Sequence, residues 1–262
     1  MTTTYNCTAA DERAKGLEHA QRAIRENKCV VLPTDTVYGI AADAFSPPAV
    51  TMLLVAKGRS RQMPPPVLIP RLNALDGLAT DVSVEARKLA EAFWPGGLTL
   101  IFHAQPSLDW DLGETKGTVA LRIPADDLAR DLLNLTGPLA VSSANRTGKP
   151  PAQTASDARE QLAESVEVYL EDGFRPVNGS DAVPSTIVDA TVLPLRVVRD
   201  GAVPLEQLRE HVPDILDVQG NPPATVPTEV TTEEPAPAEV KLDEAAPAEA
   251  PDTAPAAGPE KA

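Results

Sequence analysis

The segment Cys29-Val30-Val31-Leu32-Pro33-Thr34-Asp35-Thr36-Val37-Tyr38-Gly39-Ile40 contains two apolar runs separated by a short polar turn. The run 29–32 is typical of a β-strand, and Pro33 ends it because proline has no backbone N–H to donate to a sheet. A second extended run, 36–40, follows directly after Thr34 and Asp35. The segment therefore predicts two strands with polar side chains between them.

Further strands and helices alternate along the chain on both sides of this segment. Short apolar runs predict strands at 67–69, 98–102, 118–123, 139–141, 186–188 and 195–198. Apolar spacing and capping residues predict helices at 11–26, 46–58, 83–95, 126–134, 154–163 and 205–211. Because strands and helices interleave without a strict rhythm, we expect an α/β or α+β domain with a mixed sheet.

The composition excludes several classes of protein. The chain has 262 residues, of which 42% are apolar, and a net charge of −15. No run approaches the ~18 apolar residues of a membrane-spanning helix, and the N-terminal residues do not form a signal peptide. With only two cysteines, a reduced cytoplasmic protein that does not bind membranes is expected. The acidity also disfavours sequence-independent binding of nucleic acid.

The charge is unevenly distributed along the chain. Nine acidic residues, two lysines and nine prolines lie between Pro222 and Ala262, with almost no large apolar residues. Such a segment cannot bury enough apolar surface to offset the entropy lost on ordering. We therefore predict one folded domain over 1–216 and a disordered acidic tail, rich in proline, alanine and glutamate, over 217–262.

Common catalytic and nucleotide-binding motifs are missing from the sequence. It contains neither a phosphate-binding loop of the G-x-x-x-x-G-K-[ST] type nor a G-x-G-x-x-G motif, and it lacks a G-x-S-x-G nucleophile elbow. The three histidines are dispersed, the two cysteines lack metal-binding spacing, and Cys29 is expected to be a small core residue. No metal ligands are predicted.

One stretch is locally basic within this acidic domain. No acidic residue occurs between Asp43 and Asp76, whereas Lys57, Arg59 and Arg61 lie between them, with Arg71. These cations indicate either a solvated turn after a helix or a binding site for phosphate or carboxylate.

Polar residues at strand ends form a second group of candidates. Ser143 and Asn145 follow the strand at 139–141, where they would either cap a turn or contact a ligand. Arg122 lies inside an apolar strand and Arg199 ends another. Each arginine needs a partner, so each belongs either to a structural ion pair or to a cleft.

Seven short motifs together resemble the YrdC family of threonylcarbamoyl-adenylate synthases. They occur in the family order and cover nearly the whole predicted domain. The motifs are Pro33-Thr34-Asp35-Thr36-Val37-Tyr38-Gly39, Lys57-Gly58-Arg59, Trp94-Pro95-Gly96-Gly97-Leu98-Thr99, Thr118-Val119-Ala120-Leu121-Arg122, Ser143-Ala144-Asn145, Ser185-Thr186-Ile187-Val188-Asp189 and Arg199-Asp200-Gly201. The resemblance implies a twisted mixed sheet with flanking helices and a concave, locally basic groove, without the second domain of longer members.

The resemblance also implies a reaction. L-threonine, bicarbonate and ATP would give threonylcarbamoyl-adenylate and pyrophosphate, and Mg²⁺ is expected with the ATP. A threonylcarbamoyl transferase complex would then use this intermediate to modify tRNA. The segment Arg61-Gln62-Met63-Pro64-Pro65-Pro66-Val67 departs from the family pattern. Two alternatives remain open: a relative that uses another carbamoyl acceptor, and a module that binds double-stranded RNA.

The family's site residues transfer to matching positions in this sequence. The resemblance assigns ATP binding to Lys57, Arg59, Thr118, Ser143, Asn145 and Arg199, and threonine binding to Thr34, Arg122 and Ser185. Lys57 and Arg59 are also expected to be catalytic, and their spacing in an extended segment would place both on one face. Thr118 lies on the same strand face as Arg122.

Overall fold

The computed structural model describes residues 2–179 and 181–223, which lie in one compact unit, Met1–Ala224. The domain was predicted to end at 216, but the chain continues to pack beyond that position. Val218 accepts a hydrogen bond from Arg196 through its carbonyl oxygen, and Gly220 lies against the same side chain. Most of the predicted tail, from residue 224 onward, lies outside the described residues.

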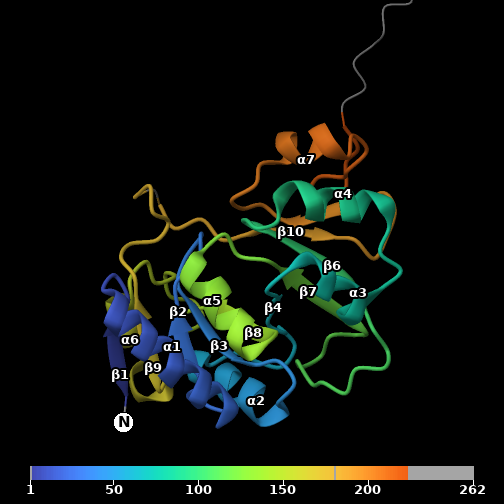
Figure 1. The fold of residues 1–262 in the computed structure, drawn as a ribbon. Coiled ribbons are helices and arrows are strands. Elements are labelled where there is room, and N and C mark those ends of the chain that lie inside the picture. Colours follow the sequence, from blue (N-terminus) through green and yellow to red (C-terminus); the bar gives the residue numbers. More distant parts are fainter. Residues whose placement is uncertain (1, 180, 224–262) are drawn as a thin grey trace, which may run out of the picture. The chain divides into compact units, whose positions relative to one another are not determined.

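The described chain forms a mixed sheet of eleven strands (Figure 1). The strands are β1 (Thr3–Asn6), β2 (Val30–Leu32), β3 (Gly39–Asp43), β4 (Val67–Leu68), β5 (Ala79–Thr80), β6 (Leu98–Ala104), β7 (Thr118–Arg122), β8 (Leu139–Ser143), β9 (Val168–Glu171), β10 (Thr186–Asp189) and β11 (Arg196–Arg199). Their order is β1-β9-β2-β3-β8-β4-β7-β6-β10-β11, and β5 pairs with β6. The sheet contains both parallel pairs, such as β6 with β10, and antiparallel pairs, such as β6 with β7.

Helices cover both faces of this sheet, as predicted. They are α1 (Ala10–Arg25), α2 (Pro47–Lys57), α3 (Leu75–Leu78), α4 (Val84–Phe93), α5 (Asp127–Thr136), α6 (Ala155–Leu162) and α7 (Leu205–His211), with short 3-10 turns at Leu72–Ala74 and Ala163–Ser165. Helices α1 and α5 share one apolar core, whereas α2, α4, α6 and α7 pack into the other (Figure 1). The α/β fold with a mixed sheet and flanking helices is therefore confirmed.

The local signals explain most element boundaries. Ser46 caps α2 by accepting a hydrogen bond from the Ala49 N–H, and Pro47 occupies the first turn. The helix ends at Lys57 because Gly58 adopts a left-handed conformation with φ of 62°. Lys57 is the last helical residue, as the predicted helix over 46–58 requires, and the extended segment expected from Lys57 to Arg59 is wrong. Cys29 is buried in the core, as predicted.

Three strands were not predicted from the sequence. Strands β1 and β9 pair with each other at one edge of the sheet, and β5 adds two residues beside β6. Strands β1 and β5 contain no apolar run of the kind that predicts a strand, and β9 becomes a strand by pairing with β1 and β2. Of the helices described, none is long and apolar enough to cross a membrane.

Candidate active site

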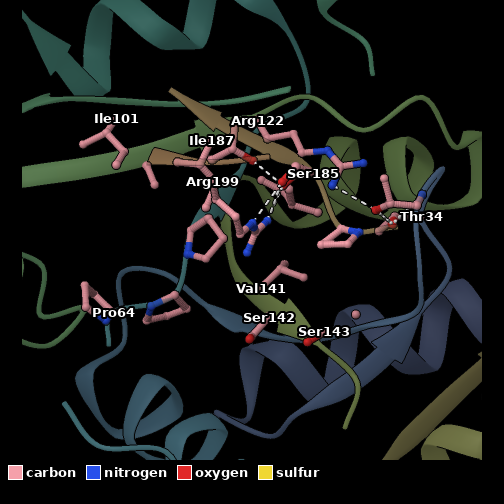
Figure 2. Close-up of a pocket in the computed structure, with 18 of the residues that line it drawn as sticks. Thr34, Pro64, Ile101, Arg122, Val141, Ser142, Ser143, Ser185, Ile187 and Arg199 are labelled. Carbon is pink, nitrogen blue, oxygen red and sulfur yellow. Dashed lines mark hydrogen bonds between the residues drawn. The ribbon is translucent and has the colours of Figure 1, made fainter. Parts of the chain in front are cut away.

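A cavity of about 280 Å³ opens between the segment 33–38, which joins β2 to β3, and the strands β7, β8 and β10 (Figure 2). A strand was predicted over 36–40, but β3 begins only at Gly39. Most of the predicted site residues line it, although they come from distant parts of the chain. These lining residues are Thr34, Arg59, Thr118, Arg122, Ser143, Ser185 and Arg199. The two remaining candidates, Lys57 and Asn145, lie beside the cavity rather than in its lining.

Arg122 ends β7 and is buried, with only 6% of its surface exposed. Its Nη2 donates to Asp35 Oδ1 at 2.7 Å, and its Nε donates to the Gly96 carbonyl oxygen at 2.8 Å. Its Nη1 donates to Thr36 Oγ1 at 3.1 Å. Arg122 was expected either in a structural ion pair or in a cleft. Both apply, because the side chain pairs with Asp35 and also lines the cavity.

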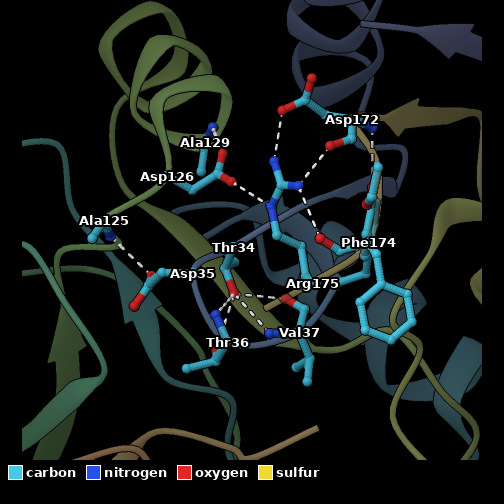
Figure 3. A network of polar contacts seen from close by, with 12 residues as sticks. Thr34, Asp35, Thr36, Val37, Ala125, Asp126, Ala129, Asp172, Phe174 and Arg175 are labelled. Atoms are coloured by element: carbon cyan, nitrogen blue, oxygen red, sulfur yellow. Dashed lines mark hydrogen bonds and ion pairs between the residues drawn. The ribbon is translucent and has the colours of Figure 1, made fainter. Parts of the chain in front are cut away.

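Thr34 holds the turn between β2 and β3 in shape (Figure 3). Its hydroxyl donates to the Val37 carbonyl oxygen at 2.6 Å and accepts from the N–H groups of Thr36 and Val37. Because that hydroxyl has one hydrogen, the 3.0 Å contact with Thr36 Oγ1 uses the Thr36 hydrogen. A chain of hydrogen bonds therefore runs from Arg122 through Thr36 to Thr34.

Ser185 and Arg199 form another side of the cavity. Ser185 Oγ lies 2.8 Å from Thr99 Oγ1, and Arg199 donates to the Ser185 carbonyl oxygen from Nε at 3.1 Å and Nη2 at 2.5 Å. Burial lowers the pKa of Arg199, and the neighbouring charges of Arg122 and Arg59 lower it further. The three guanidinium groups therefore act on one another within a single site.

Arg59 is the member of the basic stretch that reaches the cavity. Its Nη1 donates to Ser142 Oγ at 2.9 Å, whereas its buried Nε finds no partner among the described residues. Burial lowers the pKa of this guanidinium. Arg61 turns away instead and pairs with Asp111 at 2.6 Å on the surface. Of the two arginines, Arg59 therefore lines the cavity and Arg61 lies on the solvated surface.

Lys57 and Asn145 form a buried support behind Ser143. The Lys57 ammonium donates to the Ser143 carbonyl oxygen, to the Asn145 carbonyl oxygen at 2.7 Å and to Asn145 Oδ1 at 3.3 Å. These contacts engage all three of its donors. Burial lowers the pKa of Lys57 to about 8, and the charge of Arg59 adds to this effect.

The cavity is suited to anions. Its lining includes three arginines and several hydroxyl groups, and none of its lining residues is Asp or Glu. One wall is apolar and includes Pro65, Leu112 and Ile187. Within the described residues, no group of three or more His, Cys, Asp and Glu side chains could hold a metal ion. The site can therefore bind and orient anionic groups, and its lining offers no carboxylate ligand for Mg²⁺.

Two acidic side chains near this site were missed by the sequence analysis. Asp35 pairs with Arg122, and Asp126 pairs with Arg175 at 2.9 Å (Figure 3). Arg175 also bonds Asp172 Oδ2 at 2.6 Å and the carbonyl oxygens of Asp172 and Phe174. Asp35 lies within the motif at 33–39, but its partner Arg122 is 87 positions away, so no local pattern identifies the pair.

Comparisons with known proteins agree with this fold. The Sua5/YciO/YrdC family, described as "Telomere recombination", matches residues 22–201. A relative from Mycobacterium tuberculosis H37Rv, named "Putative threonylcarbamoyl-AMP synthase", is 47% identical over 201 residues, covering 77% of this chain and 91% of the relative. A Pyrococcus abyssi relative named "Threonylcarbamoyl-AMP synthase" is 36% identical over 179 residues, covering 68% of this chain and 52% of the relative.

Solved structures give the same assignment. The crystal structure of P. abyssi Sua5 complexed with L-threonine superposes with a TM-score of 0.75 at 32% identity, covering 83% of this chain and 62% of that chain. The present chain thus spans less than two thirds of the Sua5 chain. Escherichia coli YciO, at 19% identity and a TM-score of 0.68, shares the fold. The family match and these relatives establish that the chain belongs to the Sua5/YciO/YrdC family.

Proposed function

We propose that this protein is a threonylcarbamoyl-AMP synthase, a nucleotidyltransferase that makes threonylcarbamoyl-adenylate and pyrophosphate from L-threonine, bicarbonate and ATP. The relatives with 47% and 36% identity carry this name, and a relative with 32% identity has been crystallised with L-threonine. The alternative, a relative that uses another carbamoyl acceptor, is tested below by replacing threonine with other amino acids.

The observation that carries this proposal is the gathering of three arginines in one cavity without a lining carboxylate. Arg59, Arg122 and Arg199 come from segments far apart in the sequence, yet they line the same space. The proposed reaction brings together a carboxylate and a triphosphate, both anionic, and needs several cations to hold them. Guanidinium groups suit both because they bind carboxylate and phosphate oxygens in a planar fork.

In this proposal, threonine lies on the Arg122 side of the cavity. Arg122 binds the threonine carboxylate, since three bonds to the described residues leave two of its five N–H donors for a ligand. Ser185 and Thr34 contact the remaining polar groups of threonine, and the Thr34 hydroxyl does so by giving up one of its bonds within the turn. Both side chains are already fixed by hydrogen bonds, so little entropy is lost when the ligand binds.

ATP lies on the Arg59 side. Arg59 and Lys57 bind phosphate oxygens, with Lys57 exchanging one of its protein acceptors for the nucleotide. The other proposed nucleotide contacts are Thr118, Ser143, Asn145 and Arg199, and the apolar wall suits the adenine ring. Mg²⁺ would enter with ATP, held by phosphate oxygens and water, because the lining offers no carboxylate to bind it.

The chemistry needs positioning more than a protein nucleophile. Bicarbonate takes up a proton and loses water to give CO₂. The threonine amine attacks the carbon of this CO₂ and loses a proton, which forms a carbamate. A carbamate oxygen then attacks the α-phosphorus of ATP, the bond to the β-phosphate oxygen breaks, and pyrophosphate leaves. Arg59 and Lys57 stabilise the charge that develops on the leaving phosphates, and Arg122 holds threonine within reach.

The test is pyrophosphate release by the full chain when each substrate is omitted in turn. We expect release with ATP, bicarbonate and L-threonine together, and loss of release when any one is left out. Replacing threonine with other amino acids separates this activity from a relative that uses another acceptor. Release that continues at the same rate without threonine would refute the proposal.

The product would be passed to another protein. Threonylcarbamoyl-adenylate is a mixed anhydride, so it reacts with water unless a second enzyme takes it up. We propose that a threonylcarbamoyl transferase complex acting on tRNA is that partner, in the cytoplasm. The net charge of −15 disfavours a tight grip on RNA by this chain itself.

A further inference from the structure

Asp35 stands out because it bonds a cavity arginine without lining the cavity. It lies in the turn between β2 and β3, and its side chain is 18% exposed against 8% for that of Arg122. Its Oδ1 accepts from Arg122 Nη2 at 2.7 Å and from the Ala125 N–H at 2.8 Å. Asp35 Oδ1 therefore links the Arg122 guanidinium to the backbone of Ala125, three residues further along the chain.

The Arg122 guanidinium lies close enough to a second positive charge, that of Arg199, to be repelled by it. Arg199 and Arg122 repel each other within the same cavity, as the lowered pKa of Arg199 indicates. Arg122 therefore stays in place only where hydrogen-bond acceptors hold its nitrogens at fixed positions. Asp35 provides the carboxylate that pairs with Arg122, and Gly96 and Thr36 bond its other nitrogens.

We propose that Asp35 is a positioning residue for substrate binding: it fixes the Arg122 guanidinium in the orientation that receives the threonine carboxylate. The inference rests on the proposed function for the identity of the carboxylate. The fixed orientation of Arg122 is a separate claim about the protein alone. A bidentate contact is sensitive to the angle of the fork, so a small rotation of Arg122 would weaken it strongly.

Two conservative variants separate position from charge. Asp35→Asn keeps an oxygen where Oδ1 lies and removes the charge, whereas Asp35→Glu keeps the charge and moves the oxygen by one methylene. We expect Asp35→Asn to leave the KM for threonine within about threefold of wild type. We expect Asp35→Glu to raise it at least about tenfold, while the KM for ATP changes less than about threefold in both.

The opposite order, with Asp35→Glu close to wild type and Asp35→Asn impaired, would overturn the proposal, because charge alone would then explain the role of Asp35. Equal changes in the KM values for threonine and ATP in Asp35→Glu would also overturn it. Asp76→Asn is the matched control, since Asp76 pairs with Arg87 at 2.6 Å away from the cavity lining. Its KM for threonine should remain that of wild type.

A second measurement needs neither turnover nor threonine. The ¹⁵N side-chain signals of Arg122, assigned by their loss in Arg122→Lys, report rotation about its Cζ–Nη bonds. Rotation should be hindered in wild type and Asp35→Asn and faster in Asp35→Glu. Equal rotation rates in all three proteins would contradict the role of Asp35, whatever the activity of the wild type. Absence of threonine-dependent pyrophosphate release in the wild type would refute only the proposed function.

Discussion

Arg122 and Arg175 are both buried arginines paired with carboxylates, but they differ in how fully they are bonded. Arg175 bonds two carboxylates, Asp126 and Asp172, and two backbone carbonyl oxygens. Arg122 bonds one carboxylate, one hydroxyl and one carbonyl oxygen, and it lines the cavity. Arg175 uses four of its five N–H donors to hold loops together, whereas Arg122 uses three and keeps two for a ligand.

The difference predicts separate consequences for stability and activity, and the largest effect is on stability. Arg175→Met leaves Asp126 and Asp172 without their shared cation, so we expect the free energy of unfolding to fall by about 3–5 kcal/mol. Urea unfolding followed by circular dichroism measures it. A loss below about 1 kcal/mol would mean that this network is not structural.

The next effect falls on threonine binding. Arg122→Lys keeps the charge but loses the planar fork, so the KM for threonine should rise about 100-fold, or about 2.7 kcal/mol, with little change for ATP. Steady-state kinetics with each substrate varied in turn measures the split. If both KM values rise equally, Arg122 does not bind the threonine carboxylate.

Lys57 predicts a pH dependence of nucleotide binding. Its pKa is lowered from 10.5 to about 8, so the free protein loses this positive charge as the pH rises through about 8. ATP affinity should therefore fall above about pH 8, approaching tenfold per pH unit, because phosphate binds the charged form. Calorimetric titration of ATP at pH 7, 8 and 9 measures this dependence.

The control for that measurement is Lys57→Met, in which weaker binding should vary little over the same pH range. A wild-type affinity that stays constant from pH 7 to 9 would show that Lys57 does not contact the nucleotide through its charge. Binding is the better readout here, because the threonine amine also titrates during turnover.

The smallest effect is expected at the surface pair of Arg61 and Asp111. Their side chains are 50% and 43% exposed, so Arg61→Gln should cost only about 0.2–1 kcal/mol of stability. The KM for ATP should change less than about twofold. A larger rise in that KM would place Arg61 among the phosphate-binding residues, contrary to its orientation.

Most of the fold could be predicted because its strands and helices carry strong local signals. The run 139–141 and the capped helix beginning at Ser46 are recognisable from neighbouring residues alone. Strand β9 is not, because its four residues become a strand by pairing with β1 and β2. Lys57 and Arg59 do not share one extended segment, because the left-handed Gly58 ends the predicted helix directly after Lys57.

The site residues could be named from motifs, but their connections could not. Nothing near Asp35 in the sequence indicates that it pairs with Arg122. Likewise, nothing near Lys57 indicates that its ammonium group donates hydrogen bonds to Asn145. These pairings depend on how the sheet brings β3, β7 and β8 together. Sequence motifs therefore name the candidate residues, and the structure separates those that line the cavity from those that lie behind it.

The most direct test of the proposed synthase follows the carbon atom of bicarbonate. Wild-type protein is incubated with ATP, L-threonine and ¹³C-bicarbonate, and the nucleotide products are analysed by mass spectrometry. We predict an adenylate that contains threonine and one ¹³C atom and that forms together with pyrophosphate. Hydrolysis of ATP without incorporation of threonine and the labelled carbon into an adenylate would contradict the proposed function.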